Sequence, residues 1–233
     1  MIEFKGLCKT FGKVNALDNI NLHIGNKGVF AILGPNGSGK TTLIKCILGM
    51  VIPDQGSIFI NNEDVINKWE YRDDINYLPQ IADFPANLTV IELIEMVKDL
   101  RSKEADEKKL IQLFSLEPYL DKKLSVLSGG TKQKVNLTLA FMFESSVVIL
   151  DEPSTGLDPL TIIQLKELIE SKKKEGKTIL ITTHIMSLAE EISDKMVFLL
   201  DGKKYFEGTI DEIKKKTKKK SLEESIAKIL KDN

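Results

Sequence analysis

The sequence predicts an α/β fold, in which a buried sheet carries a glycine-rich loop and is interrupted by a helical segment. Two observations lead to this prediction. Short apolar runs alternate with helical patterns on both sides of residues 82–139, as in a sheet covered by helices. Residues 29–33 are apolar throughout, as expected for a strand that is buried on both faces.

The first part of the chain predicts strands at residues 2–4, 21–24, 29–33 and 56–60. A glycine-rich loop follows the third of these strands, and a helix follows the loop. The helix places its apolar side chains on one side, namely Leu43, Ile44, Ile47 and Leu48. Such a strand, loop and helix in direct succession form one unit of an α/β sheet.

The middle of the chain, about residues 82–139, has a helical pattern. One helix begins at a capping box formed by Thr89 and Glu92. After it, strands are expected at 147–150, 179–181 and 196–200. The helix between the first two should begin at Asp158 and Pro159, end near Gly176, and carry an apolar stripe of Ile162, Leu165 and Ile169.

The C-terminal residues 209–233 are expected to form a basic and amphipathic helical tail on a main domain of residues 1–208. Lysines occupy all positions of 214–220 except Thr217, and a capping box at Ser221 to Glu224 opens the last helix. We interpret the lysine run as a solvated linker. The alternative is contact with anionic lipid headgroups.

Composition indicates a globular protein that does not read nucleic acid. Hydrophobic residues make up 42% of the chain, charged residues 29%, and the formal net charge is −1. Only Arg72 and Arg101 are arginine, although arginine is the main base-reading cation. The two cysteines, Cys8 and Cys46, fit a reducing cytosol. Without a signal pattern or a spanning apolar run of ~20 residues, a membrane partner would be a separate chain.

The strongest motif is the phosphate-binding loop pattern G-x-x-x-x-G-K-[ST], which residues 34–41 match. Glycines let main-chain N–H groups turn toward phosphate oxygens, and the following helix directs its positive end at them. Lys40 can reach the β- and γ-phosphates, and the Thr41 hydroxyl can bind Mg²⁺. The loop therefore predicts nucleotide binding.

A second group of motifs lies downstream. Residues 127–133 read Leu-Ser-Gly-Gly-Thr-Lys-Gln and open a helix, and the apolar run 147–150 ends in Asp151 and Glu152. Asp151 can hold Mg²⁺ through water, and Glu152 beside it is a candidate base for an attacking water. A Leu-Ser-Gly-Gly stretch alone is more often a helix cap, but the order and spacing here favour a functional interpretation.

At these residues the chain resembles the ATP-binding-cassette (ABC) ATPases over nearly its whole length. The resemblance implies an α/β P-loop NTPase core with an N-terminal antiparallel β subdomain and an inserted helical subdomain. It also implies head-to-tail dimers, in which the signature residues Ser128, Gly129 and Gly130 close over ATP held by the partner. Residues 154–158 would lie at the dimer seam.

The resemblance assigns roles to further residues. Gln80 would contact Mg²⁺ and couple to the membrane partner, His184 would sense the γ-phosphate, and Phe11 would stack on adenine. The expected catalytic residues are Lys40, Gln80, Glu152 and His184, and the expected Mg²⁺ ligands are Thr41, Gln80 and Asp151. The expected ATP-binding residues are Phe11, Gly34, Pro35, Asn36, Gly37, Ser38, Gly39, Lys40, Thr41, Thr42, Ser128, Gly129 and Gly130.

Two positions depart from the commonest family pattern. Thr131 follows the signature glycines where Gln is usual, and Phe11 stands where Tyr is commoner. Neither change removes a group that hydrolysis requires. The resemblance therefore implies an ATPase that powers transport together with a separate membrane permease, at the cytoplasmic face of the cell membrane.

Within the family, three stretches resemble exporter-type ATPases, and most of all the ATPase of the copper-related system that supports nitrous-oxide reductase maturation. They are residues 77–81 with 87–90, residues 127–135 with 139–143, and residues 197–202 with the C-terminal tail. The cargo does not touch this subunit, so its residues do not identify the cargo.

Three alternatives remain at this stage. One is an ABC ATPase that acts on ribosomes, DNA or another non-membrane partner, although such relatives usually carry two cassettes or a long coiled coil. Another is a P-loop GTPase, since Asn67, Lys68, Trp69 and Glu70 nearly form the guanine-reading N-K-x-D motif. The third is a non-catalytic subunit, which the presence of Glu152 and His184 argues against.

Overall fold

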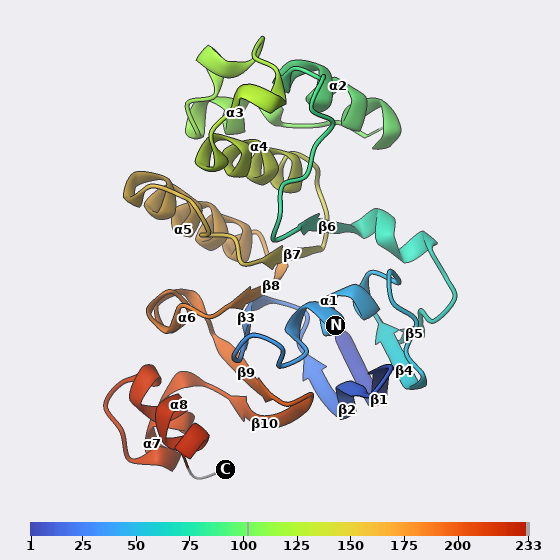
Figure 1. Cartoon of the computed structure of the whole chain (residues 1–233), viewed down its shortest axis with the longest axis vertical. Coiled ribbons are helices and arrows are strands. Elements are labelled where there is room, and N and C mark those ends of the chain that lie inside the picture. Colours follow the sequence, from blue (N-terminus) through green and yellow to red (C-terminus); the bar gives the residue numbers. More distant parts are fainter. Residues whose placement is uncertain (102, 232–233) are drawn as a thin grey trace.

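The computed structural model describes residues 1–101 and 103–231 of the chain. Within these residues the strands form a six-stranded sheet of order β10-β9-β3-β8-β7-β6 and a four-stranded sheet of order β2-β1-β4-β5. The larger sheet runs through the middle of the molecule, and the smaller sheet lies beside it (Figure 1). The α/β fold class is confirmed.

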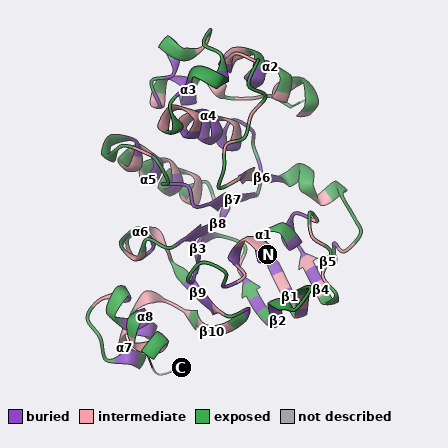
Figure 2. Cartoon of the chain, in the orientation of Figure 1, coloured by how far each residue is buried: buried purple, intermediate pink, exposed green. Residues whose placement is uncertain are grey.

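The larger sheet is parallel except at one edge. Neighbouring parallel strands are β9 (Lys195–Leu200), β3 (Gly28–Leu33), β8 (Thr178–Thr183), β7 (Val147–Asp151) and β6 (Ile75–Leu78), and β10 (Lys203–Gly208) pairs antiparallel with β9. Every residue of β3, β7 and β8 is buried, which explains their apolar sequences. Figure 2 shows these strands in purple at the centre of the fold.

The N-terminal sheet is antiparallel, as the resemblance implied. It consists of β1 (Ile2–Phe11), β2 (Val14–Ile24), β4 (Gln55–Ile60) and β5 (Glu63–Asp64). The strands predicted at 2–4 and 21–24 are only the apolar ends of longer strands. Polar residues enter the remaining parts because these strands expose one face. Helix α1 (Lys40–Ile47) contributes Leu43, Ile44 and Ile47 to the hydrophobic core between the two sheets.

The inserted helical segment forms the top of the molecule in Figure 1. It comprises α2 (Val90–Arg101), α3 (Glu107–Leu113) and α4 (Gly129–Phe141), with short 3₁₀ turns at Glu117–Tyr119 and Leu124–Val126. The predicted capping box is present. The Thr89 N–H donates to Glu92 Oε2 at 2.8 Å, and the Glu92 N–H donates to Thr89 Oγ1 at 3.3 Å.

Strand β6 was not predicted, and the reason lies in its surroundings. It is only four residues long, and a 3₁₀ turn of mostly charged residues, Glu70–Asp74, precedes it. A run of four residues is too short to show a clear hydrophobic periodicity by itself. Pairing with β7, including Leu78 opposite Leu150, makes it a strand.

The second half of the sheet is connected by α5 (Pro159–Lys174) and α6 (Met186–Ile192). Asp158 caps α5 by accepting from the Thr161 N–H at 2.9 Å, and Gly176 with a φ of 81° follows its end, as predicted. No helix in residues 1–101 or 103–231 combines the length and apolar character needed to cross a membrane.

The C-terminal tail corrects one interpretation. Lys214, Lys215 and Lys216 form the last turn of α7 (Ile210–Thr217), and the Lys214 ammonium bonds the Glu190 carboxylate of α6. The run is therefore not a solvated linker at these positions. A capping box of Thr209 and Glu212, which the lysine run obscured in the sequence, starts this helix.

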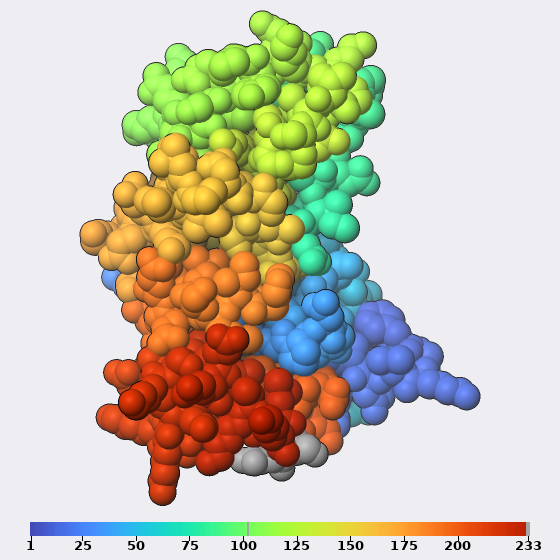
Figure 3. Space-filling view, turned by 60° about the vertical axis from the view of Figure 1, so that its left-hand side comes forward, coloured from blue at the N-terminus to red at the C-terminus, as the bar shows by residue number. Residues whose placement is uncertain are grey.

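The last helix, α8 (Leu222–Lys231), packs on the main sheet. Leu222 and Ile226 share a core cluster with Ile213 of α7 and with Met196 and Phe198 of β9. The Ser221 hydroxyl accepts from the Glu224 N–H at 3.1 Å, which is half of the predicted capping box. Figure 3 shows these C-terminal helices in red, at the end of the molecule opposite the helical insertion. The domain boundary at residue 208 stays a prediction.

Candidate active site

A cavity of about 420 Å³ opens where strands β3, β6 and β7 end. Parallel strands direct their C-terminal ends to one edge of the sheet, where ligands bind in α/β folds. The loop after β3 supplies one wall, and residues that follow β6 and end β7 supply another. The lining residues are Val14, Ala16, Asn36, Gly37, Ser38, Gly39, Lys40, Thr41, Thr42, Gln80, Asp151 and Glu152.

The loop after β3 needs glycine at two positions. Gly34 has a φ of 155°, and a Cβ there would lie 2.3 Å from the Leu199 carbonyl oxygen. Gly39 has a φ of 102°, and a Cβ there would lie 2.4 Å from the Ala16 carbonyl oxygen. Larger residues would therefore push the loop away from the sheet, and α1 could not begin at Lys40 with its free N–H groups toward the cavity.

Lys40 is held over this loop. Its side chain is buried, and Nζ donates to the carbonyl oxygens of Gly34 at 2.8 Å and Pro35 at 3.0 Å. Burial lowers the pKa of Lys40, and the negative charges of Glu152 and Asp151 act in the opposite direction. The ammonium is thus placed close to the carboxylates and to the start of α1, where positive potential attracts an anion.

Thr41 and Asp151 meet from opposite sides of the cavity. The Thr41 hydroxyl donates to Asp151 Oδ2 at 3.4 Å, and the Thr182 hydroxyl of β8 donates to Asp151 Oδ1. Burial raises the pKa of Asp151, while the hydrogen bond from Thr182 is the largest effect that opposes the rise. A bound cation would favour the ionised carboxylate. Hydroxyl and carboxylate oxygens are suitable ligands for Mg²⁺.

Glu152 adopts an unusual backbone conformation. Its φ is 51°, a left-handed value that costs a non-glycine residue roughly 1–2 kcal/mol. The Glu152 N–H is 3.1 Å from both the carbonyl oxygen and the hydroxyl oxygen of Thr182, which holds this turn in place. The carboxylate is buried, and its Oε2 lies 2.9 Å from His184 Nδ1. Backbone and side chain together fix the carboxylate at the cavity wall.

A triphosphate with a divalent cation fits this site. The buried Ser38 hydroxyl has no hydrogen-bond partner within the described part of the chain, and buried polar groups of this kind normally bond a ligand or water. The positive start of α1 and Lys40 suit phosphate oxygens. Thr41, Asp151 and Gln80 offer oxygen ligands for Mg²⁺ beside them.

The structure brings most predicted site residues together. The cavity is lined by residues 36–42, Gln80, Asp151 and Glu152. The carbonyl oxygens of Gly34 and Pro35 accept from the Lys40 ammonium. His184 contacts the site through its hydrogen bond with Glu152. Phe11 does not line the cavity, but it pairs across the strands with Val14, which does. Phe11 is 49% exposed, and the Lys9 ammonium lies 5.3 Å from the centre of its ring. Stacking of this ring on a base stays a prediction.

Ser128, Gly129 and Gly130 lie apart from the cavity of their own chain. Ser128 caps α4 by accepting from the Thr131 N–H at 3.2 Å, and Ser128 and Gly129 are exposed. A Cβ on Gly130 would lie 2.8 Å from the Gly156 carbonyl oxygen. The start of α4 and the loop 154–158 therefore form one surface.

Sequence reasoning missed three residues of the site. Thr182 bonds both Asp151 and the Glu152 backbone, and Val14 and Ala16 line the cavity. Thr182 lies opposite Asp151 in the β7–β8 register. A search for polar residues at the ends of neighbouring strands could have found it, but Val14 and Ala16 carry no chemical signal.

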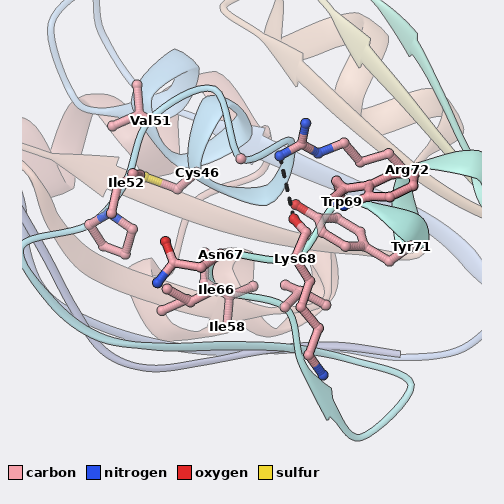
Figure 4. A pocket seen from close by; sticks show the side chains of 13 residues that line it. Cys46, Val51, Ile52, Ile58, Ile66, Asn67, Lys68, Trp69, Tyr71 and Arg72 are labelled. Atoms are coloured by element: carbon pink, nitrogen blue, oxygen red, sulfur yellow. Dashed lines mark hydrogen bonds between the residues drawn. The ribbon is translucent and has the colours of Figure 1, made fainter.

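The guanine-reading alternative does not fit the structure. Asn67 and Lys68 line a different groove of about 330 Å³, together with Trp69, Tyr71 and Arg72 (Figure 4). Neither residue lines the cavity at the phosphate-binding loop. The near match to N-K-x-D therefore lies away from the phosphate-binding loop, in the segment after β5 that enters the 3₁₀ turn at Glu70.

Comparisons with known proteins agree with this geometry. The family described as ABC transporter matches residues 17–155. The Nod factor export ATP-binding protein I of Burkholderia lata is 34% identical over 213 residues, which cover 89% of this chain and 70% of that protein. A solved structure of an ATP-binding subunit of an ABC transporter has a TM-score of 0.91 at 32% identity and covers 99% of both chains. A dimeric ATP-binding cassette in a post-hydrolysis state with ADP and Pi has a TM-score of 0.81 at 26% identity, covering 90% of this chain and 98% of that one.

Proposed function

The chain belongs to the ABC transporter family of ATP-binding proteins, and from this premise we propose that it is the ATP-hydrolysing subunit that drives a separate membrane permease. One observation carries the proposal. The cavity gathers the loop, Lys40, the proposed Mg²⁺ ligands and Glu152 from one chain, whereas Ser128–Gly130 lie outside it, with Ser128 and Gly129 exposed. A second chain would supply the missing signature.

Hydrolysis follows from the arrangement of these residues. The loop N–H groups and Lys40 bind the phosphates and compensate the charge that develops on the transferred phosphoryl group. Thr41, Asp151 and Gln80 would hold Mg²⁺, which supplies further positive charge when bound. Glu152 orients the attacking water and accepts its proton, and His184 holds the Glu152 carboxylate through Nδ1.

We propose that two chains associate head to tail, each covering the ATP of the other with its signature. The exposed start of α4 and the adjoining loop 154–158 form a suitable surface for this contact. The dimeric cassette reported above supports the proposal by similarity. Each ATP would then be enclosed by residues 34–42 of one chain and by Ser128–Gly130 of the other.

Mixing two inactive variants tests the head-to-tail arrangement. Lys40→Met should bind ATP too weakly to be active at ordinary ATP concentrations but keep its signature. Ser128→Arg should keep its ATP cavity but block contact with the partner's ATP. Neither homodimer should hydrolyse ATP, whereas the mixture should regain activity because the mixed dimer contains one intact site. Mixing either variant with itself at doubled concentration is the control. If the mixture stays inactive although mixed dimers form, the arrangement is wrong.

We propose that the permease binds the groove shown in Figure 4. This groove combines exposed apolar side chains, of which Ile52 is 61% and Trp69 65% exposed, with the polar groups of Asn67 and Arg72. Large exposed apolar residues around a groove favour docking of another protein. The groove is also connected to the ATP cavity, because the 3₁₀ turn beside it leads through β6 to Gln80.

Trp69→Arg is expected to reduce co-purification of the permease from detergent-solubilised membranes by about tenfold or more, as is typical when a buried aromatic anchor of an interface is lost. The variant must remain folded, as judged by its melting temperature. Leu230→Arg is the matched control, since Leu230 is 43% exposed on α8 and does not line this groove. Equal recovery of the permease with both variants would reject this groove as the docking site.

We further propose that the chain works in the exporter-type branch, at the cytoplasmic face of the cell membrane. The Nod factor export relative supports the branch by similarity. The narrower resemblance to the copper-related system for nitrous-oxide reductase maturation stays a prediction, as does the division into residues 1–208 and 209–233. Mass spectrometry of the permease that co-purifies would identify the branch directly.

A further inference from the structure

Helix α4 carries two buried amide side chains that no assigned role explains. Gln133 and Asn136 are 4% and 3% exposed, and they lie three residues apart on one side of the helix. The Asn136 amide nitrogen is 3.4 Å from the Gln133 amide oxygen. The two side chains are therefore joined to each other in the protein interior.

Each amide also reaches a loop at the ATP cavity. Asn136 Nδ2 donates to the Pro79 carbonyl oxygen at 3.0 Å, and Gln133 Nε2 donates to the Pro153 carbonyl oxygen at 3.2 Å. Pro79 directly precedes Gln80, and Pro153 directly follows Glu152. The strands that lead to these prolines, β6 and β7, are neighbours in the sheet. The amide pair thus bridges the two loops.

The same helix begins at the signature. Ser128 caps α4, and Gln133 lies little more than one helical turn beyond it. Because a short helix moves as a rigid unit, a shift of the signature would be transmitted to both prolines through the amide pair. Apolar side chains of the same size could fill this space, but the carbonyl oxygens of Pro79 and Pro153 would then lose their donors. The two amides therefore serve the loops beside the ATP cavity as well as the packing of α4.

We propose that Gln133 and Asn136 are positioning residues that couple the signature to Gln80 and Glu152 of the same chain. The inference rests on the proposed function, in which the signature of one chain covers the ATP of the other. Closure on the partner's ATP would then set the geometry of this chain's own site. The two sites of the dimer would consequently hydrolyse ATP cooperatively.

Two variants of similar size remove the bonds and keep the packing, namely Gln133→Met and Asn136→Leu. Each is expected to lower kcat by about tenfold, the rate effect of one lost hydrogen bond, while the Kd for ATP of the free chain stays unchanged. The Hill coefficient for ATP should fall toward one. Because the amides act as one unit, the double variant should lose little more than either single variant.

Thr138→Val is the matched control for a purely structural effect. Thr138 is fully buried on the same helix, and within residues 1–101 and 103–231 its hydroxyl bonds only the Lys134 carbonyl oxygen of α4, at 3.0 Å. The substitution should lower the melting temperature but leave kcat and the Hill coefficient unchanged. If the amide variants behave like Thr138→Val at comparable stability, Gln133 and Asn136 only support the fold and the proposal is wrong.

Hydrogen exchange separates this inference from the proposed function. In the nucleotide-free chain, Gln133→Met and Asn136→Leu should speed amide exchange at residues 80–82 and 152–156, because both loops lose an anchor. Thr138→Val should not. A wild-type chain that neither hydrolyses ATP nor dimerises would refute the proposed function, and the exchange comparison would still decide the coupling. Unchanged exchange in both loops would reject it.

Discussion

Replacing Glu152 with glutamine is expected to leave ATP binding intact, to lower turnover by about 10²–10⁴-fold, and to trap a nucleotide-bound dimer. The magnitude is that of a lost general base. The glutamine side chain has nearly the same size and can still bond His184, but it cannot accept a proton from water. ATP would then remain bound across the two chains, and the dimer would not be released.

Three measurements check this result, namely phosphate release, ATP affinity and the mass of the complex by light scattering with Mg²⁺ and ATP. Glu144→Gln is the control, because the exposed Glu144 carboxylate does not line the ATP cavity and, among the residues that the structure describes, bonds only Lys172 and Lys177. It should hydrolyse ATP like the wild type. Normal turnover by Glu152→Gln would show that another group acts as the base.

Replacing Lys40 with methionine is expected to weaken ATP binding by about 10- to 100-fold. The variant should therefore show little ATPase activity at ordinary ATP concentrations. A hydrogen bond to a charged group contributes about 1.5–3 kcal/mol, which corresponds to this range. Methionine fills similar space, so the fold should persist. The Gly34 and Pro35 carbonyl oxygens lose their donor, which should also loosen the loop.

Titration with a fluorescent ATP analogue measures this loss directly. Lys45→Met is the matched control, since Lys45 lies on the same helix but is exposed and does not line the cavity. Its affinity for ATP should equal that of the wild type. Equal affinities of the two variants would mean that residues 34–41 do not bind the phosphates.

Local features of this protein could be predicted from the sequence because they depend on neighbouring residues. The glycines at 34 and 39 are needed for backbone angles that the loop itself requires. Capping at Thr89 and Asp158 likewise involves residues three positions apart. The buried strands β3, β7 and β8 show continuous apolar runs because both of their faces are covered.

Features formed between distant segments could not be predicted in this way. Thr182 acts on Asp151 only because β8 pairs with β7 in that register, and β6 becomes a strand only through β7. The tail is also decided by such contacts. Lys214 stands in a run of lysines, and the sequence around it does not reveal its partner. That partner, Glu190, lies on another helix.

The sequence by itself determined the phosphate-binding loop and the carboxylate pair, and it predicted the signature at Ser128–Gly130 by resemblance. Tertiary structure decided that the loop, the carboxylates and Gln80 share one cavity that residues 128–130 do not line. It also decided that Gln133 and Asn136 bond the loops next to Glu152 and Gln80. The physical reason is that short motifs encode local backbone geometry. Chain folding sets the distances between motifs, because strand register and helix packing arise from contacts across the whole core.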